Sequence, residues 1–135
     1  MDVRYQAFSD ALESFAYLAH TDLATLATQL DPRLIDGLQN GQAQKFEYTL
    51  ELCWKAIKSA LNEIEGIDET SPKKVIKAWY LAGHLVEDDY LRLIAAVDDR
   101  NKLSHIYDPE EFKAIVVRLP DYASLMQRVI RTLAP

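Results

Sequence analysis

The sequence predicts an all-α fold, specifically an up-down four-helix bundle with a short extra helix. Apolar residues recur every three to four positions over long stretches, as they do on the buried face of an amphipathic helix. The chain has only four Gly and five Pro among 135 residues, and it shows no strand-like alternation of useful length. Because it contains no Pro/Gly/Ser-rich linker and falls within the usual size of one domain, we expect a single domain over residues 1–135.

The first third of the chain predicts one long helix. Its apolar residues follow helical spacing: Phe8, Leu12, Phe15, Ala19, Leu23, Leu26 and Leu30. Asp31-Pro32 ends this helix and opens a short one over about residues 33–38, with Asp31 as the cap and Pro32 in the first helical position. Gly37 and Asn40-Gly41 then allow the chain to turn.

The middle of the chain predicts a second long helix and a shorter one. Helical spacing of apolar residues continues over about residues 42–65, and Gly66 ends that helix. Ser71-Pro72 is typical of a cap followed by a proline in the first turn, so a shorter helix is expected to start there. Gly83 supplies the end of this helix.

Two further helices complete the predicted bundle. The fourth begins near the acids at 87–89, which favour the positive end of a helix dipole, and continues through Leu91, Ile94 and Val97. It is expected to end around residues 105–107, because a residue before proline avoids helical geometry. Asp108-Pro109 opens the last helix, which Pro120 is expected to kink.

Composition limits the classes of function. The net charge is −6, whereas nucleic-acid binding normally leaves a basic surface, so a nucleic-acid partner requires a small local basic patch. The sequence shows no signal-peptide pattern and no apolar run of the roughly 20 residues needed to span a bilayer, so we expect a cytoplasmic, soluble protein. The single cysteine, Cys53, lies on an apolar helix face, and no Cys/His spacing predicts a metal site or a cofactor.

The stretch from Arg100 to Tyr107 carries the candidate chemistry. Arg100 is able to hold a phosphate through two parallel hydrogen bonds. His105 is able to take and give a proton, because an ordinary histidine pKa is about 6.5. Tyr107 adds a hydroxyl that another enzyme is able to modify. The alternative is structural, since cationic side chains near a helix end stabilise its carbonyls and its dipole.

Helix geometry decides which of these groups meet. Arg100 and His105 are five residues apart and point about 140° away from each other on a straight helix, so two protomers of a homodimer bring them together most simply. Asp98, Asn101 and His105 share a face, so Asp98 or Asn101 is expected to orient the imidazole. A weak basic patch for RNA is expected from four lysines: Lys73, Lys74, Lys77 and Lys102.

Three separated segments also resemble a known family in order and spacing. They cover residues 44–55, 71–76 and 99–108. The sequence is similar, over roughly residues 35–130, to the nucleotidyltransferase substrate-binding family within the HEPN superfamily. That resemblance implies a homodimeric helical bundle whose partner is a minimal nucleotidyltransferase.

The resemblance implies two alternative functions. The first is a metal-independent ribonuclease toxin of a toxin-antitoxin pair, in which His105 moves the proton of the attacking 2′-hydroxyl and Arg100 stabilises charge on the phosphoryl oxygens. Asn101 also matches the superfamily pattern, and the partner antitoxin would silence the toxin by adding AMP to Tyr107. The alternative is a non-catalytic subunit that binds a substrate for, or regulates, a nucleotidyltransferase. This chain lacks a Gly-Ser followed by paired aspartates, so it is not itself the transferase.

Overall fold

A computed structural model describes residues 3–105 and 108–134. Within these residues the chain forms six α-helices and no strand, which confirms the predicted all-α class. The helices are α1 (Val3–Ala19), α2 (Leu23–Leu26), α3 (Pro32–Glu65), α4 (Pro72–Leu81), α5 (Glu87–Leu103) and α6 (Pro109–Leu133).

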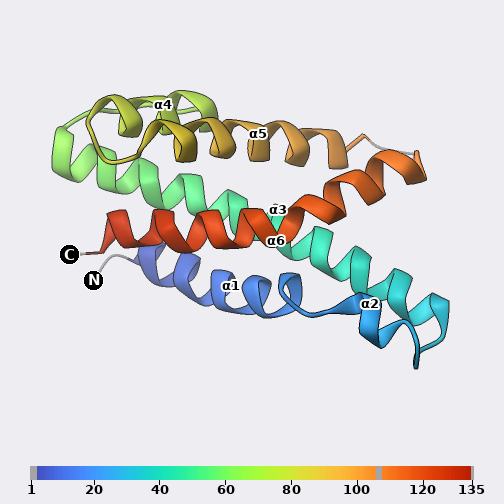
Figure 1. The fold of residues 1–135 in the computed structure, drawn as a ribbon. Coiled ribbons are helices and arrows are strands. Elements are labelled where there is room, and N and C mark those ends of the chain that lie inside the picture. Colours follow the sequence, from blue (N-terminus) through green and yellow to red (C-terminus); the bar gives the residue numbers. More distant parts are fainter. Residues whose placement is uncertain (1–2, 106–107, 135) are drawn as a thin grey trace.

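The four long helices run alternately up and down, with α4 as the extra helix. In Figure 1, α3 and α6 cross in the middle, α1 lies on one side of them, and α4 and α5 lie on the other. Side chains on α3 reach progressively earlier residues of α1, since Gln42 binds the Leu18 carbonyl and Lys45 binds Ser14, so α1 and α3 are antiparallel. Helices α5 and α6 are also antiparallel, because Asp89 at the start of α5 pairs with Arg128, whereas Asp99 further along α5 pairs with the earlier Arg118.

One apolar core joins α1, α3, α4, α5 and α6. Its largest fully buried side chains include Trp79, Phe8, Phe15, Phe46, Leu50 and Ile57. Phe46 of α3 is central, because it contacts Phe15 of α1 at 6.0 Å and Tyr122 of α6 at 5.3 Å between ring centroids. Cys53 is also fully buried, and burial raises the pKa of its thiol, so it packs as a small apolar side chain.

The prediction of one helix from Phe8 to Leu30 is wrong. The helix ends at Ala19, where the Thr21 hydroxyl donates to the Tyr17 carbonyl at 2.7 Å. Asp22 then accepts a hydrogen bond from the Thr25 backbone N–H and caps the four-residue helix α2. Local side-chain hydrogen bonds therefore override the apolar spacing, which continues across the break.

The predicted turn at Gly37 and Asn40-Gly41 is also wrong, because α3 is continuous over 34 residues and absorbs the expected short helix. Neither glycine adopts a positive φ, which in the described residues occurs only at Gly66 and Gly83. The Asn40 amide donates to the Asp36 carbonyl at 2.8 Å within the helix. At Gly41, a Cβ would lie 3.6 Å from Leu18 of α1, so the packing of α3 along α1 keeps the helix continuous there.

The predicted helix starts at Pro32, Pro72 and Pro109 are confirmed. Asp31 and Asp108 each accept a hydrogen bond from a backbone N–H two residues later, which satisfies a donor that the helix itself leaves free. Ser71 occupies the cap position of α4 without a side-chain cap hydrogen bond.

Glycine ends α3 as predicted. Gly66 adopts a left-handed conformation with φ 68° immediately after the last residue of the helix. Gly83 has φ 92° and follows α4 after one further residue, Ala82. Pro120 lies inside α6, and Figure 1 shows that this helix changes direction between its orange first part and its red second part.

Helix α5 differs from the prediction in its end and in its buried face. It ends at Leu103, two residues before His105. Its buried residues are Leu93, Ala96, Val97 and Asp99, whereas Leu91, expected on the apolar stripe, is exposed. The buried face of α5 is therefore rotated relative to the predicted one. As a result, Asp99 points towards α6 and Arg100 towards α3.

Among the described residues, no helix combines the length and apolar character needed to cross a membrane.

Candidate functional site

Arg100 is held against α3 rather than left free for a phosphate. Its Nη2 lies 2.8 Å from Oε2 of Glu51, and its Nε donates to the Glu47 carbonyl oxygen at 3.3 Å. The side chain is about one-third exposed, so the pair lies at the edge of the core. The guanidinium thus anchors the last turn of α5 to the middle of α3.

Glu51 collects three donors on one carboxylate. Its Oε2 accepts from Trp54 Nε1 at 3.0 Å as well as from Arg100, and its Oε1 lies 3.1 Å from Lys55 Nζ. Partial burial works to raise the pKa of Glu51, but hydrogen bonds from Trp54 and Lys55 and the charge of Arg100 lower it overall. Glu51 therefore stays ionised and orients all three side chains.

Glu47 is a candidate site residue that the sequence analysis missed. Partial burial raises the pKa of its carboxyl, and the nearby charge of Arg100 only partly offsets this effect. Glu47 lines an open cavity of about 370 Å³ between α3, the end of α5 and the start of α6. The other lining residues are Asn40, Ala43, Gln44, Leu103 and Phe112.

The chemistry of this cavity follows from its lining. Two amides and a carboxyl whose pKa is raised offer both hydrogen-bond donors and acceptors to a polar ligand. The sequence signal for Glu47 was its place one helical turn before Glu51 on the same face of α3. That spacing becomes informative only when Arg100 is seen to face the same side.

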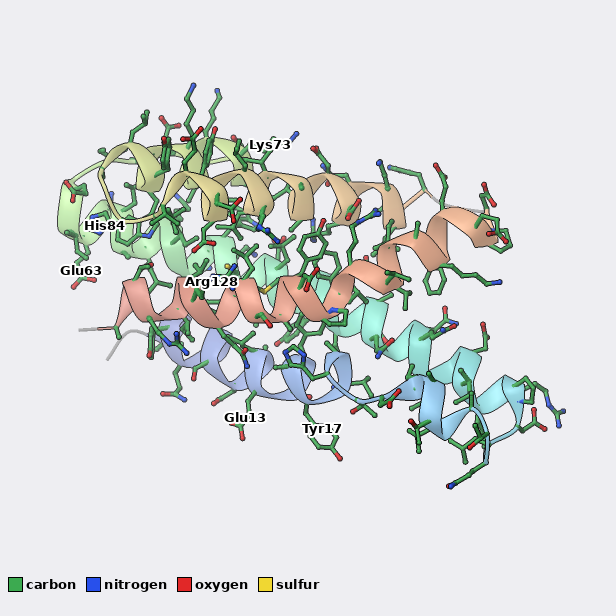
Figure 2. The ribbon with its side chains drawn as sticks, in the orientation of Figure 1. Glu13, Tyr17, Glu63, Lys73, His84 and Arg128 are labelled. Carbon is green, nitrogen blue, oxygen red and sulfur yellow. The ribbon has the colours of Figure 1, made fainter. Side chains whose placement is uncertain are left out.

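The expectation that Asp98 or Asn101 orients the His105 imidazole stays a prediction, because no contact of either side chain with His105 is seen among the described residues. Asp98 binds Nζ of Lys73 at 2.6 Å instead, and Figure 2 shows Lys73 projecting from α4 beside α5. Helix α5 ends at Leu103, and Ser104 still has helical φ and ψ of −70° and −16°, so the chain reaches His105 in a tight turn. The backbone N–H of His105 donates to the Lys102 carbonyl at 2.9 Å and its side chain is exposed.

Of the other two expected site residues, Asn101 and Tyr107, only Asn101 is among the described residues. Asn101 is exposed and makes no side-chain hydrogen bond to a described residue. Tyr107 lies outside the described residues. Within residues 3–105 and 108–134, no three His, Cys, Asp or Glu side chains gather in a way that could hold a metal ion.

The four lysines of the expected basic patch lie on adjacent helices. Helix α4 packs against α5, so Lys73 reaches Asp98, which is one turn away from Lys102. Lys74, Lys77 and Lys102 are exposed. The ion pair with Asp98 offsets one of the four positive charges.

A second missed feature is the buried carboxylate of Asp99, next to Arg100. It accepts two hydrogen bonds from Arg118, at 2.8 and 2.9 Å, and one from the Tyr122 hydroxyl at 2.6 Å. Burial and the hydrogen bond to Asp99 raise the pKa of Tyr122, while the hydrogen bond to Asp99 raises that of Arg118. This network fixes α5 on α6 and thereby sets the rotation that turns Arg100 towards α3.

Fold and site together define an all-α module in which the long helix α3 carries the polar site. The chain belongs to the nucleotidyltransferase substrate-binding family, because the model described as "Nucleotidyltransferase substrate binding protein like" matches residues 3–134. This match confirms the resemblance to the nucleotidyltransferase substrate-binding family, whereas the place of that family within the HEPN superfamily stays a prediction.

Solved structures support the same fold. A Thermus thermophilus protein is 34% identical, with a TM-score of 0.82 over 95% of this chain and 99% of that one. A Haemophilus influenzae protein, described as revealing the fold of a substrate-binding domain of a nucleotidyltransferase, is 22% identical, with a TM-score of 0.79 over 96% of this chain and 98% of its own. No curated protein matches the sequence.

Proposed function

We propose that this protein is a non-catalytic subunit that binds a substrate for, or regulates, a separate nucleotidyltransferase chain. The family match over residues 3–134 supports this function. The sequence itself lacks the Gly-Ser and paired aspartates of a nucleotidyltransferase, so the transfer chemistry belongs to the partner.

The observation that carries the proposal is the ion pair of Arg100. A ribonuclease built on this motif needs the guanidinium to stabilise charge on a phosphoryl group. Here Glu51 at 2.8 Å and the Glu47 carbonyl already occupy it. An RNA phosphate would have to break these contacts, which also hold α5 on α3. A non-catalytic binding module needs no free guanidinium, so the contacts remain in place.

The ribonuclease toxin is the second candidate, because His105 is exposed and lies just beyond the end of the helix that carries Arg100. In this alternative, a homodimer supplies a second copy of each group, and AMP on Tyr107 blocks RNA by its bulk and its charge. Light scattering coupled to size-exclusion chromatography measures the molecular mass in solution, which is twice that of the 15.4 kDa chain if this dimer forms.

A transfer assay with the partner tests the proposed function. The minimal nucleotidyltransferase from the same organism is given radiolabelled ATP and cell extract, with and without this protein. We expect labelled product to depend on the protein and to be unaffected by His105→Ala. Transfer that proceeds equally well without the protein would contradict the proposal.

A second assay separates the two candidates. The folded, unmodified protein is incubated with total RNA in EDTA, and we expect the RNA to remain intact. Cleavage that disappears in His105→Ala would favour the ribonuclease instead.

The AMP switch has its own readout, which is intact mass after co-expression with the transferase. A gain of AMP that Tyr107→Phe abolishes would identify the modified residue. Tyr17→Phe serves as the matched control, since Tyr17 is 81% exposed and points away from the bundle (Figure 2).

A further inference from the structure

A second open cavity of about 420 Å³ lies between the first turn of α1 and the later part of α3, on the Lys55 side of Glu51. The residues that line it are Arg4, Trp54, Lys55, Lys58, Ser59, Asn62 and Asp68. Cavities of about 300–1,000 Å³ are typical of small-ligand sites.

The lining is unusually cationic for this protein. Three of its side chains are positively charged, Arg4, Lys55 and Lys58, against two carboxylates, Asp68 in the lining and Glu51, which pairs with Lys55 from just outside it. The chain as a whole carries a net charge of −6, so this local excess runs opposite to the rest of the molecule. Such a concave cationic site concentrates anions near it.

The two lysines are held in place and keep donors available. Lys58 Nζ donates to Asp68 Oδ1 at 3.0 Å and to the Glu69 carbonyl at 2.8 Å, and Lys55 Nζ lies 3.1 Å from Glu51. An ammonium group has three donors, so Lys58 retains one and Lys55 retains two. Because neighbouring groups already fix both ammonium groups, an arriving anion meets donors that need little reordering.

Trp54 gives the cavity a flat apolar wall. Its indole N–H donates to Glu51 at 3.0 Å, which fixes the ring, and the residue is only partly buried. A fixed, partly exposed indole favours another flat ring against it. Ser59 and Asn62 add hydroxyl and amide groups to the same lining.

From this juxtaposition of fixed cations, a fixed indole and polar side chains, we propose that the cavity binds a nucleoside phosphate. The phosphate contacts Arg4, Lys55 and Lys58, and the base lies on Trp54. This inference rests on the proposed function, because it names the class of substrate that the module holds.

Isothermal titration calorimetry on the isolated protein tests the inference, with AMP as the probe and adenosine and inorganic phosphate as partial ligands. We expect AMP to bind at least about tenfold more tightly than either part, since each part satisfies only one half of the site. Tryptophan fluorescence gives a local readout, because Trp79 is fully buried and a change on binding therefore reports Trp54.

Charge-removing variants locate the site. Arg4→Gln and Lys58→Gln, each checked for folding by circular dichroism, are expected to weaken AMP binding about tenfold. Lys113→Gln removes the same charge from the first turns of α6, at a different cavity, and is expected to leave binding unchanged. Two substitutions on separate helices keep the test informative if one of them fails to fold.

Three results would overturn the proposal. These are no heat and no fluorescence change at millimolar AMP, equal affinity for AMP and inorganic phosphate, or folded Arg4→Gln and Lys58→Gln variants that bind AMP like the parent. Because the titration omits the nucleotidyltransferase, these results leave the outcome of the transfer assay untouched. Loss of AMP binding alone would therefore remove this inference and not the proposed function.

Discussion

Replacing Asp99 with alanine is expected to destabilise the bundle more than any single surface ion pair does. The substitution removes the acceptor for the Tyr122 hydroxyl at 2.6 Å and both hydrogen bonds from Arg118. The side chain of Asp99 is 6% exposed, so the Tyr122 hydroxyl loses a partner in a place where water replaces it poorly. Arg118 is 44% exposed and turns to solvent at little cost.

The size of the effect follows from these contacts. An unsatisfied buried hydroxyl costs about 1–3 kcal/mol, and the partly exposed ion pair contributes about 1 kcal/mol. Alanine has a higher helix propensity than aspartate, which adds back about 0.5 kcal/mol to the free energy of unfolding. The net loss is therefore about 1.5–3.5 kcal/mol in the free energy of unfolding, which lowers the Tm of a chain of this length by about 5–12 °C.

Thermal unfolding followed by circular dichroism at pH 7 measures this loss. Tyr122→Phe keeps the ring stacked on Phe46 and removes only the hydroxyl, so we expect a drop of about 4–5 °C. Asp98→Ala is the matched control, because it removes the neighbouring, half-exposed carboxylate and costs about 3 °C or less. An Asp99→Ala protein that melts within about 2 °C of the parent would show that the network does not hold α5 on α6.

Two further predictions concern Glu47 and two glycines, Gly37 within α3 and Gly66 immediately after it. Because burial raises the pKa of Glu47, the folded state loses stability as pH rises from the unfolded pKa through the folded one, so Glu47→Gln should raise the Tm at pH 7 and not at pH 3. An equal effect at both pH values would argue against burial as the cause. Gly66→Ala should cost about 1 kcal/mol, because φ is 68° there, whereas Gly37→Ala should stabilise by about 0.5–1 kcal/mol, since a Cβ meets nothing within 4 Å in that helical position. Urea unfolding measures both, and shifts of the same sign would contradict this reasoning.

The helix starts and the fold class were predictable because their causes are local. An aspartate followed by proline specifies a helix start through its own carboxylate and a fixed φ, and the structure has this at Asp31 and Asp108. Apolar spacing identified Phe8, Phe15 and Phe46 as buried residues. None of these inferences needs a distant part of the chain.

The site was less predictable because its contacts join residues far apart in sequence. Arg100 and Glu51 lie 49 positions apart, and both belong to helices whose polar residues look solvent-facing in isolation. Asp99 is charged and therefore looks like a surface residue, yet hydrogen bonds from Arg118 and Tyr122 of α6 offset the cost of its burial. The break after Ala19 was missed because the apolar spacing continues across it, while Thr21 and Asp22 make the local hydrogen bonds that end one helix and begin another.

The sharing of Glu51 has a thermodynamic consequence. The carboxylate of Glu51 binds Arg100, which comes from α5. The same carboxylate binds Lys55 and Trp54 of α3, which line the cavity next to α1. A ligand that draws the Lys55 ammonium away from Glu51 strengthens the ion pair between Glu51 and Arg100. A ligand that separates Arg100 from Glu51 leaves more negative charge beside Lys55. By linkage, binding at either of these two places must change affinity at the other by the same factor, so two ligands on opposite flanks of α3 would not act independently.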